Sequence, residues 1–245
     1  MTPSIAELRG RTQPDSIFAR NSGEHWAGKL YMRGFSPYLT RLLIGTRVTP
    51  NGVTWLMILV GLVAATVLTL PGPWPALAVV VLIQLQLLLD CADGEVARWR
   101  GERSALGVYL DRIGHWLTEA ALPIALGLRT GDQTYVRLGL VIAVLVLLIK
   151  GESALVTVAR AESGQPPAGD TREVAAPRAG VLRRLRRMLG FAPFFRAFVA
   201  VEATLLALVA DILDATEVLV VALVVVAAVT ALGHFVAILT SQRLR

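Results

Sequence analysis

Runs of about twenty residues with almost no charge constrain this chain more than any other feature. Residues 216–240 are nearly all aliphatic, and residues 51–71 carry no charged side chain. A helix of this length and composition can cross the hydrocarbon core of a bilayer. Hydrophobic residues make up 55% of the 245-residue chain and charged residues only 17%, which is unusual for a soluble domain of this length. The sequence therefore predicts a bundle of transmembrane helices.

We expect an all-α integral membrane bundle of six transmembrane helices, at about 51–71, 75–99, 105–128, 134–158, 193–213 and 216–240. Residues 29–46 mix leucines and aromatic residues with arginines, which predicts an amphipathic juxtamembrane helix. Residues 1–28 form a polar N-terminal tail in this interpretation, and residues 29–245 form one membrane domain.

A basic cytosolic loop is expected at 160–192. Its first part, 161–177, is rich in Gly, Pro and charge and indicates a flexible connection. The second part, 178–190, fits two interpretations: a basic amphipathic helix on the membrane surface, or a plain loop that determines topology.

Lysines and arginines concentrate before the first apolar run, after the second, after the fourth and at the C-terminus. The positive-inside rule therefore predicts a multi-pass protein of the cell membrane with both termini in the cytosol. The C-terminal end of the second helix then also lies at the cytosolic surface. Because the net charge of +6 comes from these flanks, we expect contact with membrane lipids and no nucleic-acid binding.

Ionisable residues interrupt the second and third apolar runs, where they are costly and therefore functional candidates. At about 3.6 residues per turn, Asp90, Asp93 and Ala97 share one helix face. A second stripe has a spacing of four residues and consists of Gly107, Asp111, His115 and Glu119. If the two stripes face each other, three aspartates converge at the cytosolic mouth of the bundle. Hard oxygen ligands of this kind suit Mg²⁺ or Mn²⁺.

Small residues accompany the aspartates: Gly94, Ala97 and Gly107 would let a nucleotide or a helix approach closely. Arg98 could pair with a diphosphate. A purely structural alternative also fits, in which arginines neutralise the acids in ion pairs between helices. The candidate arginines are Arg98, Arg103 and Arg112.

Seven of these positions form the pattern D-x-x-D-G-x-x-A-R-x₈-G-x-x-x-D, which runs from Asp90 to Asp111. The pattern resembles the signature of the CDP-alcohol phosphotransferase (CDP-alcohol phosphatidyltransferase) family. The general layout over about 29–240, with Thr49-Pro50-Asn51 before the first span, is similar too. The resemblance implies a transferase of phospholipid biosynthesis that moves a substituted phosphate group from a CDP-alcohol to an alcohol or alcohol-phosphate acceptor and releases CMP. CDP-diacylglycerol is the first donor to consider.

The resemblance also implies a role for each matching residue. Asp90, Asp93 and Asp111 would hold Mg²⁺ or Mn²⁺, which neutralises the donor diphosphate. The cytidine nucleotide would be bound by Gly94, Ala97, Arg98 and Gly107. The family is often dimeric, so a homodimer is an expected partner.

The chain departs from the family pattern at His115, where an aspartate that serves as metal ligand and catalytic base is expected. Three interpretations stay open. His115 is the base, with Glu119 one turn later orienting it. Alternatively, Glu119 or Asp111 is the base, or the chain has lost transferase activity and only binds nucleotide and metal. Histidine can also ligate Mn²⁺ or Zn²⁺, although it is a poorer ligand for Mg²⁺.

Charged residues in the fourth and fifth apolar runs are candidates for the acceptor site. Lys150 and Arg196 could bind a phosphorylated alcohol, or they could form ion pairs with Glu152 and Glu202. We expect His234 to be an interfacial or packing residue and Asp211 to be solvated near the outer surface.

Two other function classes compete with a transferase. One is a non-catalytic nucleotide- or metal-binding membrane protein. The other is a transporter, which should show internal repeats and broken helices at the midplane. Neither feature is apparent in the sequence, and the acids gather toward one membrane surface, which disfavours transport.

Overall fold

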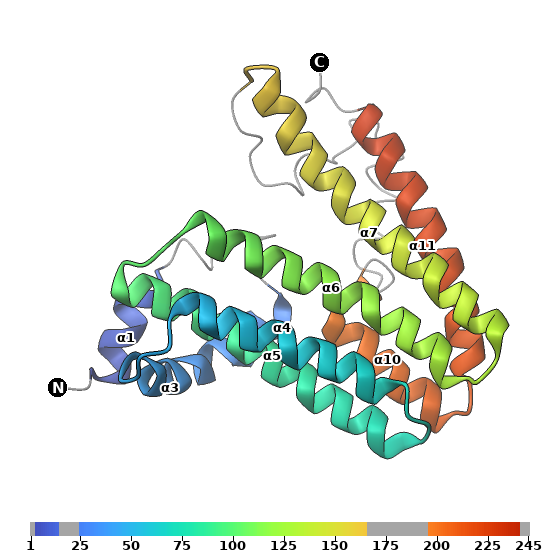
Figure 1. Cartoon of the computed structure of the whole chain (residues 1–245), viewed down its shortest axis with the longest axis horizontal. Helices are drawn as coiled ribbons and strands as arrows, with labels where there is room; N and C mark the ends of the chain where they lie inside the picture. Colours follow the sequence, from blue (N-terminus) through green and yellow to red (C-terminus); the bar gives the residue numbers. More distant parts are fainter. Residues whose placement is uncertain (1–2, 15–24, 166–195, 241–245) are drawn as a thin grey trace. The chain divides into compact units, whose positions relative to one another are not determined.

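The computed structural model describes residues 3–14, 25–165 and 196–240, and every regular element in these ranges is a helix (Figure 1). The all-α prediction is therefore confirmed. The basic segment predicted at 178–190, and most of the loop predicted at 161–177, lie outside the described residues. The chain divides into two compact units, the first formed by Met1–Ala64 with Val81–Thr118 and the second by Ala65–Val80 with Glu119–Arg245.

Short helical elements occupy the N-terminal part of the first unit: α1 (Ile5–Thr12), the π-helical η1 (Gly28–Met32) and α3 (Arg33–Ile44). Together η1 and α3 cover the predicted amphipathic stretch, and α3 exposes Phe35 and Leu42. Helix α1 was not predicted and lies in the polar tail. It begins after Ser4, whose Oγ accepts a hydrogen bond from the backbone N–H of Glu7 at 3.1 Å.

Six further helices follow within the described residues: α4 (Pro50–Leu68), α5 (Pro73–Arg100), α6 (Ala105–Arg129), α7 (Gln133–Glu162), α10 (Ala200–Ile212) and α11 (Thr216–Leu239). Polar side chains cap three of them. Thr49 Oγ1 accepts from the Gly52 N–H at 3.1 Å, which confirms the predicted start of α4. Ser104 and Asp132 cap α6 and α7 in the same way.

Four helices in the described part of the chain are long and apolar enough to cross a membrane: α4, α5, α7 and α11. Helix α6 is continuous over 25 residues, but charged side chains interrupt its apolar sequence. The span expected at 193–213 corresponds to α10, whose 13 residues extend only about 20 Å, less than the ~30 Å of a hydrocarbon core. The count of six spans therefore stays a prediction.

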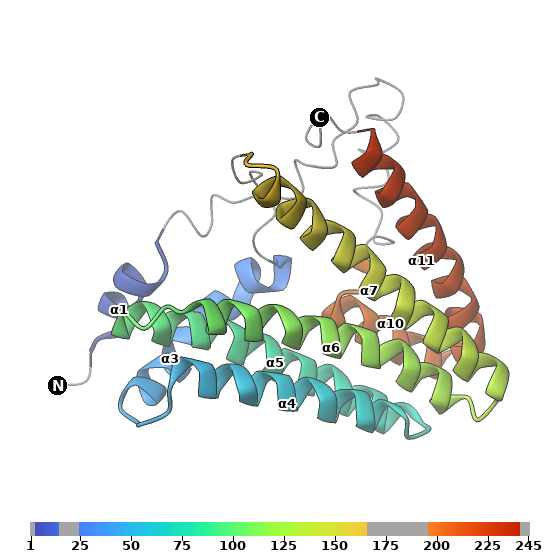
Figure 2. The same cartoon turned by 45° about the horizontal axis from the view of Figure 1, so that its top comes forward.

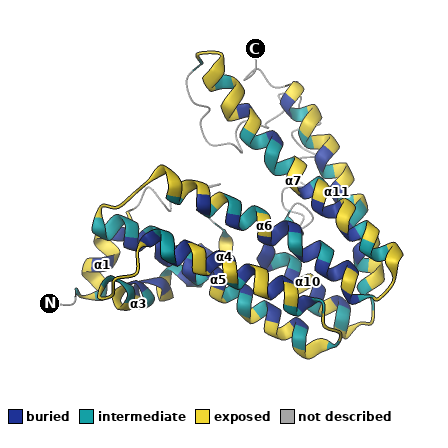
Figure 3. Cartoon of the chain, in the orientation of Figure 1, coloured by how far each residue is buried: buried dark blue, intermediate teal, exposed yellow. Residues whose placement is uncertain are grey.

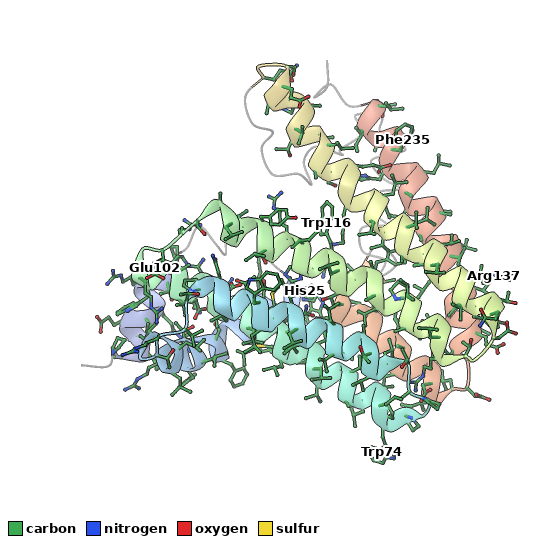
Figure 4. All side chains as sticks on the ribbon, viewed as in Figure 1. His25, Trp74, Glu102, Trp116, Arg137 and Phe235 are labelled. Atoms are coloured by element: carbon green, nitrogen blue, oxygen red, sulfur yellow. The ribbon has the colours of Figure 1, made fainter. Side chains whose placement is uncertain are left out.

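Many residues of the candidate spans are exposed (yellow in Figure 3), and large apolar side chains are frequent among them. Helices α7 and α11 pack side by side in the second unit (Figures 1 and 2), yet most of their apolar stretches stay unburied. Val144, Val225 and Val229 are each more than half exposed. Trp74 projects from the start of α5 (Figure 4), as a residue of the membrane interface would. Contiguous apolar surface of this extent suits lipid and not water, which agrees with a multi-pass membrane protein.

Tight packing in the first unit fixes the helices that carry the predicted site. Val53, Met57 and Ile58 on α4 form a buried cluster with Leu89 on α5. Gly114 brings α6 against α4, because a Cβ atom at this position would lie 2.6 Å from Ile58 Cγ1. The neighbouring residue on α6 is His115, so its backbone is held where two helices touch.

Candidate active site

Three predicted site residues come together in the first unit: Asp90 on α5, and Asp111 and His115 on α6. One ligand atom of each side chain lies within 4.8 Å of the others. His115 Nε2 is 3.0 Å from Asp90 Oδ1 and 3.5 Å from Asp111 Oδ1. Because an ionised carboxylate only accepts hydrogen bonds, the contact with Asp90 assigns the hydrogen of a neutral His115 to Nε2.

Asp93, the fourth predicted ligand, lies outside this trio and on the wall of a cleft. Its Oδ2 accepts a hydrogen bond of 2.7 Å from Thr54 Oγ1 on α4. The cleft has a volume of about 190 Å³ and is bounded by the start of α4, the end of α5 and the start of α6. It is lined by Pro50, Asn51, Thr54, Asp93, Gly94, Ala97, Arg98, Glu102, Arg103, Ser104, Gly107, Val108 and Asp111. Asp111 therefore belongs both to the trio and to the cleft.

All four residues predicted for the nucleotide site line this cleft: Gly94, Ala97, Arg98 and Gly107. The glycines are needed for close packing. A Cβ atom at Gly94 would lie 3.0 Å from Arg98 Nη1, and one at Gly107 would lie 3.0 Å from Asn51 Oδ1. Side chains at these positions would therefore press on polar groups of the cleft wall.

Arginine–aspartate ion pairs, the structural alternative, are not formed here. Within the described residues, none of Arg98, Arg103 and Arg112 forms an ion pair with Asp90, Asp93 or Asp111. Two polar atoms at the site are instead buried without a hydrogen-bond partner, Asp111 Oδ1 and Arg98 Nη2. An unsatisfied buried group costs roughly 1–3 kcal/mol, so a ligand that reached these two atoms would be stabilised by them.

The residues present fit a divalent cation. Carboxylate oxygens from Asp90 and Asp111 are the hard donors that Mg²⁺ and Mn²⁺ prefer, and Asp111 Oδ1 has the 3.5 Å contact with His115 but no hydrogen-bond donor. The imidazole of His115 would favour Mn²⁺ over Mg²⁺ if it also became a ligand.

Four residues discussed from the sequence belong to the second unit: Glu119, Lys150, Arg196 and Asp211. Glu119 Oε2 lies 2.6 Å from Lys150 Nζ. Arg196 is partly buried in the turn that precedes α10. Asp211 was expected to be solvated, but its side chain is only 12% exposed because Arg129 covers it in an ion pair.

Several residues of the cleft were not predicted from the sequence, and some carried a usable signal. Thr54 is a polar side chain near the start of an apolar helix, which is the usable signal. It lies one helical turn after Pro50 and therefore on the same helix face. Glu102 (Figure 4), Arg103 and Ser104 lie in the connection between α5 and α6, where local patterns do not specify side-chain direction.

Aspartates beside a cleft that contains arginine are typical of enzymes that bind a phosphorylated substrate together with a divalent cation. The family model CDP-alcohol phosphatidyltransferase matches residues 47–241, most of the chain, so the protein belongs to the CDP-alcohol phosphatidyltransferase family. These are CDP-alcohol phosphotransferases of phospholipid synthesis and are generally metal-dependent. A search of curated proteins gave no match.

Proposed function

We propose that the protein transfers the phosphatidyl group of CDP-diacylglycerol to an alcohol or an alcohol phosphate and releases CMP. In this reaction the acceptor oxygen forms a bond to the phosphorus that carries the diacylglycerol. The bond from that phosphorus to the bridging oxygen breaks, and CMP leaves with this oxygen. The proposal rests chiefly on one observation: the four motif residues Gly94, Ala97, Arg98 and Gly107 line a single cleft that Asp111 borders.

The donor nucleotide is proposed to occupy this cleft. Arg98 and Arg103 supply positive charge for the diphosphate, and Gly94 lets the Arg98 guanidinium lie close to the helix backbone. A bound Mg²⁺ or Mn²⁺ would neutralise charge on the diphosphate and on the departing CMP. Asp90, Asp93 and Asp111 are the residues proposed to hold the cation.

His115 is proposed as the base that takes the proton of the acceptor hydroxyl. A neutral imidazole with its hydrogen on Nε2, directed at Asp90 Oδ1, carries its lone pair on Nδ1. Asp90 would then fix the tautomer and stabilise the imidazolium that forms, as orienting carboxylates do in other enzymes. Asp111 is the alternative base. Glu119 is less suitable, since its carboxylate is engaged by Lys150.

The base role and the ligand role of His115 exclude each other at one nitrogen. A metal-bound Nε2 has no hydrogen, so the hydrogen of the neutral ring moves to Nδ1, which then cannot accept a proton. Loss of metal affinity on replacing His115 would therefore favour the ligand role. Loss of catalysis with unchanged metal affinity would favour the base.

Lys150 and Arg196 are proposed to attract the phosphate of a phosphorylated acceptor. Both are cations in the second unit with partly buried side chains. We further propose that the cleft and both termini face the cytosol and that the chain forms a homodimer, as the charge pattern and the family resemblance imply.

The direct test is CMP release by detergent-purified protein with CDP-diacylglycerol, Mg²⁺ or Mn²⁺, and a panel of alcohols and alcohol phosphates. We expect acceptor-dependent release that falls about 10²–10⁴-fold in His115→Ala, the usual contribution of a positioned base. His115→Asp should recover part of this loss, because a carboxylate can also take the proton. Mn²⁺ affinity, measured by electron paramagnetic resonance, should change little in His115→Ala.

A catalytically inactive member that binds nucleotide and metal is the alternative, and the substitution of histidine for the motif aspartate favours it. The hypothesis of an inactive member predicts that the protein binds CDP and Mn²⁺ but releases no CMP from any donor. Activity gained by His115→Asp alone would support it, since that variant restores the family pattern.

A further inference from the structure

The last turn of helix α1 lies against the donor cleft of the first unit. The carbonyl oxygen of Thr12 accepts a hydrogen bond from Arg98 Nε. Thr12 and Leu8 are both fully buried, and the guanidinium of Arg11 lies 4.6 Å from the ring centre of Trp99. Carbonyl groups at the end of a helix lack partners within the helix and carry partial negative charge. They are therefore suitable acceptors for an arginine.

The residue after α1 is tied to the same stretch of α5. Gln13 Nε2 donates to Glu95 Oε1 at 2.8 Å and to the carbonyl of Arg33 at 2.9 Å. Glu95 is completely buried and also accepts from Ser36 Oγ and Thr40 Oγ1 on α3. Glu95 and Arg98 are three residues apart on α5, so α1 engages one helix face at two adjacent points.

These contacts leave a defined part of Arg98 for a ligand. The Nε–H is used by Thr12, while Nη1 lies over Gly94, where a Cβ atom would be only 3.0 Å from it. Nη2 is buried and has no partner. A guanidinium fixed at Nε presents the Nη1–Nη2 edge in one orientation, which suits bidentate contact with phosphate oxygens.

We propose that helix α1, through the Thr12 carbonyl and the Gln13–Glu95 hydrogen bond, is a positioning element that orients Arg98 toward the diphosphate of the donor. This inference rests on the proposed function, because it requires a CDP-linked donor in the cleft. Helix α1 lies outside the residues that the family model matches, so the role belongs to this chain's own N-terminal segment.

The test measures equilibrium binding of CDP to the full-length protein in detergent with Mn²⁺ present. Leu8→Asp places a charge in a fully buried position and should undock α1. We expect the Kd for CDP to rise about tenfold, as for the loss of one oriented charged hydrogen bond. Glu7→Ala is the matched control, because Glu7 is on the exposed side of the same helix and should leave the Kd unchanged. Mn²⁺ affinity should be equal in all three proteins.

A double-mutant cycle with Arg98→Ala distinguishes positioning from general support of the fold. If α1 acts through Arg98, Leu8→Asp should have no further effect on CDP binding in the Arg98→Ala background. Additive losses, or a wild-type Kd in Leu8→Asp, would overturn the proposal. Gln13→Ala serves in the same cycle if Leu8→Asp does not fold. Failure of the wild-type protein to bind CDP would instead reject the proposed donor site, and the inference with it.

Discussion

In the second unit each of three acids that are buried or partly buried contacts one basic side chain, whereas in the first unit two acids converge on a single histidine beside a cleft that a third acid lines. Arg129 pairs with Asp211, Lys150 with Glu119, and His234 with Glu152. Asp90 and Asp111 instead share His115. Two aspartates on one histidine leave negative charge uncompensated, which a purely structural site would avoid.

Glu95 shows that the first unit can also satisfy a buried acid completely. Its two oxygens accept from Gln13, Arg33, Ser36 and Thr40. Only a few residues away on α5, Asp90 and Asp93 have far fewer protein donors. This contrast within one helix indicates that the aspartates are available to bind a ligand, whereas Glu95 stabilises the fold. We therefore expect mutation of the aspartates at the cleft to change activity and mutation of the paired acids to change stability.

The largest difference is expected between Asp111→Asn and Asp211→Asn. Asp111→Asn should lower CMP release about 10³-fold, as does the removal of a group that stabilises transition-state charge. Its unfolding temperature should be equal to or higher than that of the wild type. The second should lower the unfolding temperature, because Arg129 loses its ionic partner, and leave the turnover of the folded enzyme unchanged. CMP release and thermal unfolding in detergent measure both. A stable but inactive Asp211→Asn would break the comparison.

Removal of the cation partner in the second unit should have the next largest effect. Arg129 donates to the carbonyls of Leu68, Leu70 and Gly72 as well as to Asp211, so it closes the connection between α4 and α5. Arg129→Leu leaves a buried carboxylate and these carbonyls unpaired, which should cost about 3–5 kcal/mol of unfolding free energy. Denaturant titration measures this loss, and Arg137→Leu, on an exposed site of α7 (Figure 4), is the control. A loss below about 1 kcal/mol would contradict a structural role for Arg129.

Local sequence features were sufficient for much of this fold and site. The long apolar runs predicted α4, α5, α7 and α11, because this signal depends on neighbouring residues. The spacing of the motif placed Asp111 and Gly107 on one helix face, and the family resemblance implied that they would meet the residues of α5 at one site. A four-residue period places side chains on one face of a helix whatever the rest of the chain does.

Features that depend on distant residues were missed. Helix α1 has only eight residues and is too short to be stable alone, so its contacts with α3 and α5 are needed to form it. Asp211 forms an ion pair with Arg129, a residue 82 positions away in the sequence. The apolar stretch at 193–213 gave no sign that the helix would begin only at Ala200, after Val199 in an extended conformation.

A smaller effect is expected at Lys150, where the pair with Glu119 leaves two roles to separate. If Lys150 binds a phosphorylated acceptor, Lys150→Met should raise the KM for such acceptors about tenfold and leave neutral alcohols unaffected, since one charged contact is lost. The panel of acceptors in the CMP-release assay measures this ratio. Equal losses with both acceptor types, together with stability recovered by adding Glu119→Leu, would make the pair purely structural.

The smallest effect should come from His234, which provides the sharpest contrast with His115. Both histidines contact carboxylates, but His234 Nδ1 has one partner, Glu152 Oε2 at 2.7 Å, and Ser153 Oγ lies 3.5 Å from its Nε2. His234→Gln keeps a hydrogen-bond donor beside Glu152, so CMP release should change less than about twofold and stability by less than about 1 kcal/mol. The same substitution at His115 removes the base and should abolish most activity. Similar losses at both positions would mean that a histidine beside a buried acid is equally important in either unit, and that convergence of acids does not mark the site.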